Sequence, residues 1–307
     1  MRIGIDLGGS KIEGIVMGVG SAILHRSRMV TPQGSYTGTI HALVDLIQRL
    51  EKAAGLGALP VGIGHPGSIS PASGLMRNSN SLCLNGRPLQ QDLQKALGRE
   101  IRMANDANCL ALSEASDGAA KDAKNVFAVI LGTGVGGGIC INGRLLAGRN
   151  AIAGEWGHNS LPWPRPEWDE VNGTQCWCGK PSCIETWLSG VGLAADHQRI
   201  TGDAISAEEV AVRAEAGDEK CSATLSRYED RLARALAQII NILDPEVIVV
   251  GGGVSRVQRL YKHVPALWDQ WIFSDEIHTR LVPALHGDAS GVRGAAWLWP
   301  EAGIVST

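Results

Sequence analysis

Hydrophobic positions along the chain alternate between a strand-like and a helix-like period. Runs rich in β-branched residues predict the strands of the first half, at residues 2–7, 11–18, 22–30 and 61–64. A 3.6-residue apolar period predicts a helix from about Tyr36 to Ala54, and residues 88–119 follow a helix–strand–helix pattern. The first half is therefore expected to be α/β.

The second half opens in the same way. A strand at 126–131 is followed by a glycine turn and another strand at 138–141, just as 2–7 and 11–18 flank a glycine turn. The later pattern predicts helices at 207–215 and 224–243, a strand at 247–250 and a last helix at about 290–299. This repetition predicts a duplicated, bilobal α/β fold with nucleotide held in the cleft between the lobes. We place the lobes at residues 1–120 and 121–289, with the boundary near 118–124.

Composition limits the classes of function. The chain has 307 residues, 44% of them hydrophobic and 19% charged, as in a globular protein with a sizeable core. The net charge of -3 argues against a nucleic-acid partner, because binding a phosphate backbone needs an excess of positive charge. No apolar run reaches the roughly 18 residues of a membrane span, and a strand at residue 2 leaves no signal peptide. We expect a cytoplasmic protein without a membrane partner.

Three glycine turns that follow strands are candidate phosphate-binding sites. Their backbone N–H groups can approach phosphate oxygens, the Thr133 hydroxyl can bond to them, and Asp6 can hold Mg²⁺ directly or through water. The first turn alone is equally compatible with a simple hairpin, but three such turns favour nucleotide binding. The expected ATP-binding residues are Asp6, Gly8, Gly9, Ser10, Lys11, Gly132, Thr133, Gly134, Gly251, Gly252 and Gly253.

Three of the seven cysteines lie within eight residues. Cys176, Cys178 and Cys183 have the spacing of metal ligands, and His158 upstream can complete a tetrahedral Cys3His zinc site. A disulfide is disfavoured in a cytosolic chain. With four protein ligands the Zn²⁺ would be structural, bracing its loop rather than activating water. The scattered Cys83, Cys109, Cys140 and Cys221 are expected in the core.

The glycine turns, in this order, with Asn105-Asp106-Ala107-Asn108 and the cysteine cluster, resemble the ROK family over essentially the whole chain. The resemblance implies a bilobal actin-like ATPase fold of the duplicated ribonuclease H-like type, and a C-terminal helix, about 290–307, that returns to the first lobe. It also implies a homodimer. Asp106 would be the catalytic base that accepts the proton of a sugar hydroxyl. An isolated Asn-Asp pair would otherwise be interpreted as a helix N-cap.

The resemblance also implies a set of sugar-binding residues. Asn105, Glu155, His158 and Glu185 match it, and His158 would direct one ring nitrogen to zinc and the other to sugar. Gly67, Ser68 and Asn80 are candidates for further hydroxyl contacts, with a loop turn as the equal alternative. The chain departs from the family pattern at Pro181-Ser182, before the last cysteine, and at Ser10, where threonine is more usual.

The stretches around His65-Pro66-Gly67, Asn78–Ser81 and Trp156–Trp163 are most similar to bacterial fructokinases that also accept mannose. The expected reaction is therefore ATP-dependent phosphorylation of fructose at its 6-hydroxyl, with N-acetylglucosamine kinase or glucokinase as the alternative. A sugar-responsive regulator of the same family would need a DNA-binding segment ahead of the first strand, which we do not expect here. An actin-like chaperone or filament protein would have no reason to carry the sugar residues and the zinc cluster.

Overall fold

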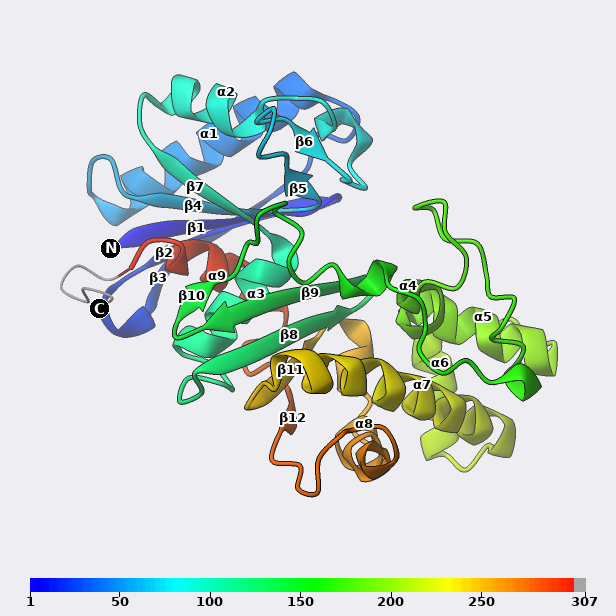
Figure 1. Ribbon diagram of the computed structural model, residues 1–307. Helices are drawn as coiled ribbons and strands as arrows, with labels where there is room; N and C mark the ends of the chain where they lie inside the picture. Colours follow the sequence, from blue (N-terminus) through cyan, green and yellow to red (C-terminus); the bar gives the residue numbers. More distant parts are fainter. Residues whose placement is uncertain (301–307) are drawn as a thin grey trace. The chain divides into compact units, whose positions relative to one another are not determined.

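The computed structural model describes residues 1–300, which divide into two units (Figure 1). The first contains residues 1–121, 143–153 and those from 288 onward, and the second contains 122–142 and 154–287. Each is a mixed α/β unit, as the sequence predicts. Residues 301–307, the end of the expected C-terminal helix, lie outside the described residues.

The first unit is built on a five-stranded sheet with the order β3-β2-β1-β4-β7 (Figure 1). Its strands are β1 (Arg2–Leu7), β2 (Lys11–Met17), β3 (Ile23–Val30), β4 (Val61–His65) and β7 (Ile101–Asn105). β1, β2 and β3 are antiparallel neighbours, whereas β4 runs parallel to β1 and β7 parallel to β4. Because parallel strands end at the same edge of a sheet, Asp6, His65 and Asn105 come to one edge.

Helices cover both faces of this sheet. The helices of the unit are α1 (Tyr36–Ala54), α2 (Leu89–Leu97), α3 (Asp106–Ser116) and α9 (Ser290–Trp297), and its short strands are β5 (Ser68–Ile69) and β6 (Met76–Arg77), whereas β10 (Arg144–Leu145) belongs to the other five-stranded sheet. The apolar stripe of α1 packs with the β1 side chains in one core. On the other face, α9 lies so close that a side chain at Gly4 or Gly62 would overlap its backbone carbonyls.

The second unit repeats the opening hairpin. β8 (Asn125–Leu131) and β9 (Val135–Ile141) are antiparallel, β11 (Val247–Gly251) runs parallel to β8, and β12 (Arg280–Pro283) runs parallel to β11. The helices of this unit are α4 (Ile184–Leu188), α5 (Gly190–Thr201), α6 (Ala207–Glu215), α7 (Glu219–Leu243) and α8 (Leu260–His263). The apolar faces of α5, α6 and α7 share one buried core with the strands.

Three element boundaries differ from the sequence-based prediction by two residues or more. β9 begins at Val135 instead of 138, because Gly136 and Gly137 pair with β8 although they carry no side chain that could show the strand period. α7 begins at Glu219 instead of 224, where Asp218 caps its first turn by accepting a hydrogen bond from the backbone N–H of Cys221. α9 ends at Trp297 instead of 299.

None of the helices within residues 1–300 combines the length and apolar character that a bilayer crossing requires.

Candidate functional site

Asp6 and Asp106 form the acidic centre of the first unit. Asp6 is the second-last residue of β1, and Asp106 is the first residue of α3, directly after β7. Burial, followed by the charges of Asp106 and Glu13, raises the pKa of Asp6 to about 6, and Lys11 opposes this rise. A buried carboxylate near a second carboxylate binds either a proton or a cation favourably, so this pair fits Mg²⁺.

Asn105 fixes the start of α3. Its side-chain oxygen accepts a hydrogen bond from the backbone N–H of Ala107 at 2.9 Å, so Asn105 rather than Asp106 is the N-cap of this helix. The Asn105 amide also donates to the Gly67 carbonyl at 3.1 Å. Gly67 has a φ of 74°, and a side chain there would overlap the Arg77 carbonyl, so this turn requires glycine.

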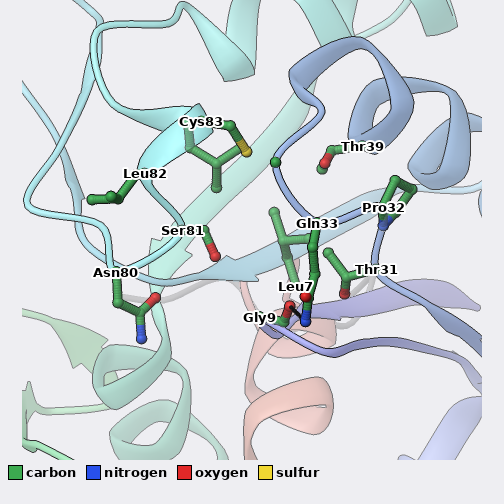
Figure 2. Close-up of a pocket in the computed structure, with 12 residues that line it drawn as sticks. Leu7, Gly9, Thr31, Pro32, Gln33, Thr39, Asn80, Ser81, Leu82 and Cys83 are labelled. Atoms are coloured by element: carbon green, nitrogen blue, oxygen red, sulfur yellow. Dashed lines mark hydrogen bonds between the residues drawn. The ribbon is translucent and has the colours of Figure 1, made fainter.

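The two other predicted hydroxyl contacts of this unit lie in different surroundings. Ser68 is buried, and its hydroxyl accepts a hydrogen bond from Arg77 at 3.1 Å, which ties together β5 and β6. Asn80 instead lines a cavity of about 490 Å³ together with Gly9, the segment 31–34 and residues 81–84 (Figure 2). The mixture of amide, hydroxyl and apolar groups in this cavity suits a polar organic ligand.

Side chains from the segment after β3 hold the glycine turn between β1 and β2 through hydrogen bonds. The Thr31 hydroxyl donates to the Gly8 carbonyl at 2.7 Å, and the Gln33 amide donates to the Gly9 carbonyl at 3.2 Å. Gly9, Ser10 and Lys11 are exposed at the tip. The anchored carbonyls leave a preformed turn whose exposed tip can meet a phosphate.

The second unit holds the other two glycine turns. The Gly132 N–H donates to the Gly134 carbonyl at 3.0 Å, and the Gly190 N–H at the start of α5 donates to the Gly132 carbonyl at 2.7 Å. Thr133 is exposed at the tip. In the turn from Gly251 to Gly253, Gly252 has a φ of 83°, and a side chain on it would overlap the Leu131 backbone. The two turns are therefore adjacent at the ends of β8 and β11.

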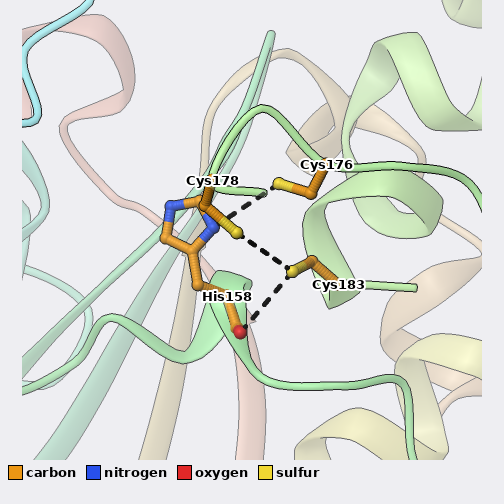
Figure 3. Close-up of side chains that lie close together, drawn as sticks. All are labelled: His158, Cys176, Cys178 and Cys183. Carbon is orange, nitrogen blue, oxygen red and sulfur yellow. Dashed lines mark hydrogen bonds between the residues drawn. The ribbon is translucent and has the colours of Figure 1, made fainter. Parts of the chain in front are cut away.

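His158, Cys176, Cys178 and Cys183 come together as the spacing predicts (Figure 3). Their ligand atoms all lie within 4.8 Å of one another. The Cys176 sulfur lies 3.7 Å from His158 Nδ1, and the Cys178 and Cys183 sulfurs are 3.5 Å apart. Metal–ligand bonds of about 2.0–2.3 Å in a tetrahedron give ligand separations of about 3.3–3.8 Å, so the four side chains fit zinc. His158 would bind through Nδ1, which leaves Nε2 for another partner.

Glu185 connects this cluster to a glycine turn. It lies on α4, and its Oε2 accepts a hydrogen bond at 2.9 Å from the backbone N–H of Val135, the residue after the turn at 132–134. Its Oε1 accepts a hydrogen bond at 2.7 Å from the indole of Trp177. The third predicted sugar contact of this unit, Glu155, is half-buried and precedes the short 3₁₀ helix Trp156–His158. The sequence analysis did not name Trp177 as a candidate site residue. Its position between two predicted zinc ligands is the signal that could have identified it.

A buried ionic network anchors the long segment between His158 and Cys176. Arg234 on α7 is fully buried and donates to Glu170 at 2.9 Å, to Asp230 at 2.7 Å and to the Pro162 carbonyl at 2.6 Å. Arg231, also buried, donates to Glu170 at 2.6 Å. Since Glu170 is itself fully buried, its charge depends on these guanidinium partners. The network therefore fixes the segment 158–183, which carries the four proposed zinc ligands and is called the zinc loop below, to α7, the longest helix of the unit.

Comparisons with known proteins show the family to which the chain belongs. The model described as "ROK family" matches residues 2–302. The N-acetyl-D-glucosamine kinase of Pectobacterium atrosepticum is 37% identical over 303 residues, covering 97% of this chain and 98% of that protein. The ROK hexokinase of Thermus thermophilus superposes with a TM-score of 0.84 at 29% identity, covering 96% of both chains. A ROK family glucokinase from Streptomyces griseus, solved with glucose and AMPPNP, gives 0.79 at 26% identity, covering 98% of this chain and 99% of that one.

Proposed function

The chain belongs to the ROK family and is a sugar kinase, and on that premise we propose that it transfers the γ-phosphoryl group of ATP to the 6-hydroxyl of N-acetyl-D-glucosamine. The sequence motifs favoured fructose, with N-acetylglucosamine as the alternative. The curated relatives support the alternative, because the Pectobacterium atrosepticum and Escherichia coli proteins, each 37% identical over 97% of this chain, carry that name.

The observation that carries the proposed chemistry is the pairing of Asp6 with Asp106 at one edge of the first sheet. Asp106 would accept the proton of the sugar 6-hydroxyl while the oxygen forms its bond to the γ-phosphorus. The bond from that phosphorus to the β,γ-bridging oxygen breaks, and ADP leaves. Asp6 would hold the Mg²⁺ that neutralises phosphate charge.

The remaining residues would position the reactants. Asn105 ties the Gly67 turn to the start of α3, so the amide and the turn carbonyl have fixed places beside Asp106. Glu155, His158 and Glu185 would bond sugar hydroxyls, and the glycine turns would hold the phosphates. The zinc would fix His158 through Nδ1 and leave Nε2 to face the sugar.

A coupled ADP-release assay tests the proposal. Wild-type protein with Mg²⁺ and ATP is presented separately with N-acetylglucosamine, N-acetylmannosamine, glucose, mannose and fructose. We expect the highest kcat/KM with N-acetylglucosamine and a product whose phosphorus NMR spectrum is that of a 6-phosphate. A higher kcat/KM with fructose would restore the sequence-based interpretation, and no turnover with any sugar would refute the kinase.

Asp106→Asn tests the role of the base. We expect kcat to fall by about 10²–10⁴-fold, because the amide cannot accept the proton. Asp117→Asn is the matched control, since Asp117 terminates the same helix α3 and pairs with Arg293 away from the acidic centre. Wild-type turnover in the Asp106 variant would remove this residue from the mechanism.

A further inference from the structure

Trp177 has an unusual environment for a tryptophan. Its residue surface is 67% exposed, although indole side chains are normally among the more buried in a protein. It stands between Cys176 and Cys178 in the sequence, and the side chains of these two cysteines lie beside His158 (Figure 3). The two neighbouring zinc ligands restrain its backbone, so the ring is displayed from a fixed position.

The ring is also oriented by contacts with two proposed sugar-binding residues. Its indole N–H donates to Glu185 Oε1 at 2.7 Å, and its ring meets the His158 ring edge-to-face with centroids 5.0 Å apart and planes at 85°. Both contacts restrict the ring rotation of a side chain that has only two rotatable bonds. Most of its surface nevertheless faces water, which is unfavourable for a large apolar group.

The same hydrogen bond determines how Glu185 presents its carboxylate. Val135 N–H holds Oε2 and Trp177 holds Oε1, so the carboxylate plane is fixed from both sides. An ionised carboxylate has about four acceptor sites, so each oxygen can still accept a hydroxyl. A sugar bonded to Glu185 would therefore lie against the indole that bonds the same carboxylate.

We propose that Trp177 is a substrate-contacting residue whose indole face packs against the C–H face of the hexose bound by Glu185 and His158. A pyranose ring carries a flat array of polarised C–H bonds on one face, and these are attracted to the negative face of an aromatic ring. The exposed surface of Trp177 is then covered only when sugar is bound. This inference rests on the proposed sugar kinase function and adds to it a specificity-determining aromatic wall.

The test compares three variants of the zinc-loaded protein. Trp177→Phe keeps an aromatic ring but loses the indole N–H, and Trp177→Ala loses both. Trp163→Phe is the matched control, because Trp163 is a half-exposed tryptophan of the same unit that stacks on Trp271 instead. Each variant is assayed for zinc content, for sugar KM, for ATP KM and for the change of tryptophan fluorescence when sugar is added without ATP.

We expect the sugar KM to rise about 3–10-fold in Trp177→Phe and about 10–100-fold in Trp177→Ala, with ATP KM, kcat and zinc content close to wild type. The fluorescence response to sugar should be present in wild type and Trp163→Phe and largely lost in Trp177→Phe. The chain has nine tryptophans, so the signal is assigned by this difference.

Two results would overturn the inference while leaving the kinase intact. The first is an unchanged sugar KM together with an unchanged fluorescence response in both Trp177 variants. The second is loss of zinc with a parallel rise of both KM values, which would give Trp177 a structural role only. Should the wild-type protein phosphorylate a hexose other than N-acetylglucosamine, the same measurements are made with that hexose. Absence of any sugar-dependent turnover in wild type would overturn the function and the inference together.

Discussion

The Asp6→Asn substitution distinguishes two effects of the Asp6 carboxylate. One is the unfavourable free energy of burying it, and the other is its proposed role in phosphoryl transfer. The pKa of Asp6 rises from 3.8 to about 6 in the folded chain, chiefly because the group is buried and secondly because Asp106 lies near. A shift of about two units corresponds to about 3 kcal/mol at a pH where the group is ionised. Asparagine has nearly the same shape and no charge, so the substitution should recover part of this free energy.

The sign of the pH dependence follows from the raised pKa. Folding favours the protonated form, so below about pH 4 Asp6 is neutral in both states and has no electrostatic cost. Between about pH 4 and 6 the unfolded chain releases this proton first, and the wild-type protein loses stability relative to the variant. Above about pH 6 the difference is constant and at its largest.

Thermal unfolding in magnesium-free buffer measures the difference. Magnesium is removed by gel filtration rather than by a chelator, which would also strip zinc. We expect the Tm of Asp6→Asn to exceed that of wild type by about 5 °C at pH 7.5 and by much less at pH 4.5. Mg·ATP should raise the Tm of wild type but not that of the variant, which should also lack kinase activity.

Glu13→Gln is the matched control. Glu13 stands opposite Asp6 in the β1–β2 pair and is also buried, but it forms ion pairs with Arg26 and Arg28. Neutralising a paired carboxylate leaves two guanidinium groups without their partner and should lower the Tm at pH 7.5. A Tm for Asp6→Asn at or below wild type at both pH values would refute the reasoning.

Three further predictions concern the zinc loop, the ionic network and the buried histidine. Cys183→Ser should reduce the zinc content, measured by mass spectrometry of the metal, from one per chain to less than about 0.1, and should raise KM for sugar and ATP together. Arg234→Met should lower the free energy of unfolding by about 3–5 kcal/mol in denaturant titrations, because it leaves Glu170 underneutralised, and the Arg234→Met/Glu170→Met double variant should recover part of that loss. Burial lowers the pKa of His65 to about 4, so the wild-type protein should lose up to about 3 kcal/mol between pH 7 and 4, because the unfolded chain binds a proton on this ring while the folded protein does not. His65→Phe should show a smaller fall of Tm over that range; an equal fall would assign the pH dependence to other groups.

The sequence predicted those parts of the molecule that depend on local pattern. Both opening hairpins could be found because glycine turns interrupt runs of β-branched residues. The cluster of His158 with three cysteines could be found because three thiols within eight residues, with a histidine upstream, are typical of a structural metal site. In both cases the distance along the chain fixes the distance in space, since the residues belong to one turn or one loop.

Interactions between distant segments were not predictable in this way. Arg231 and Arg234 look like part of a solvent-facing stripe of α7, yet both are buried. Their partner Glu170 lies more than sixty residues away, in a segment without regular pattern. One preferred hexose could not be singled out for a related reason, because the proposed sugar-binding residues would bond hydroxyls that many sugars share.

Glu185 links the zinc loop to the turn at 132–134, which we propose binds nucleotide. Its two carboxylate oxygens bond Trp177 in the zinc loop and the backbone N–H that follows the turn at 132–134. A side chain on Gly134 would come within 2.5 Å of the same carboxylate, so the turn and the carboxylate are packed in direct contact. We expect loss of zinc to free the loop and loosen both bonds, so sugar and ATP affinity should fall together. Removing the Trp177 indole breaks only one of them, so the bond to Val135 should keep the nucleotide turn in place and confine the damage to sugar binding.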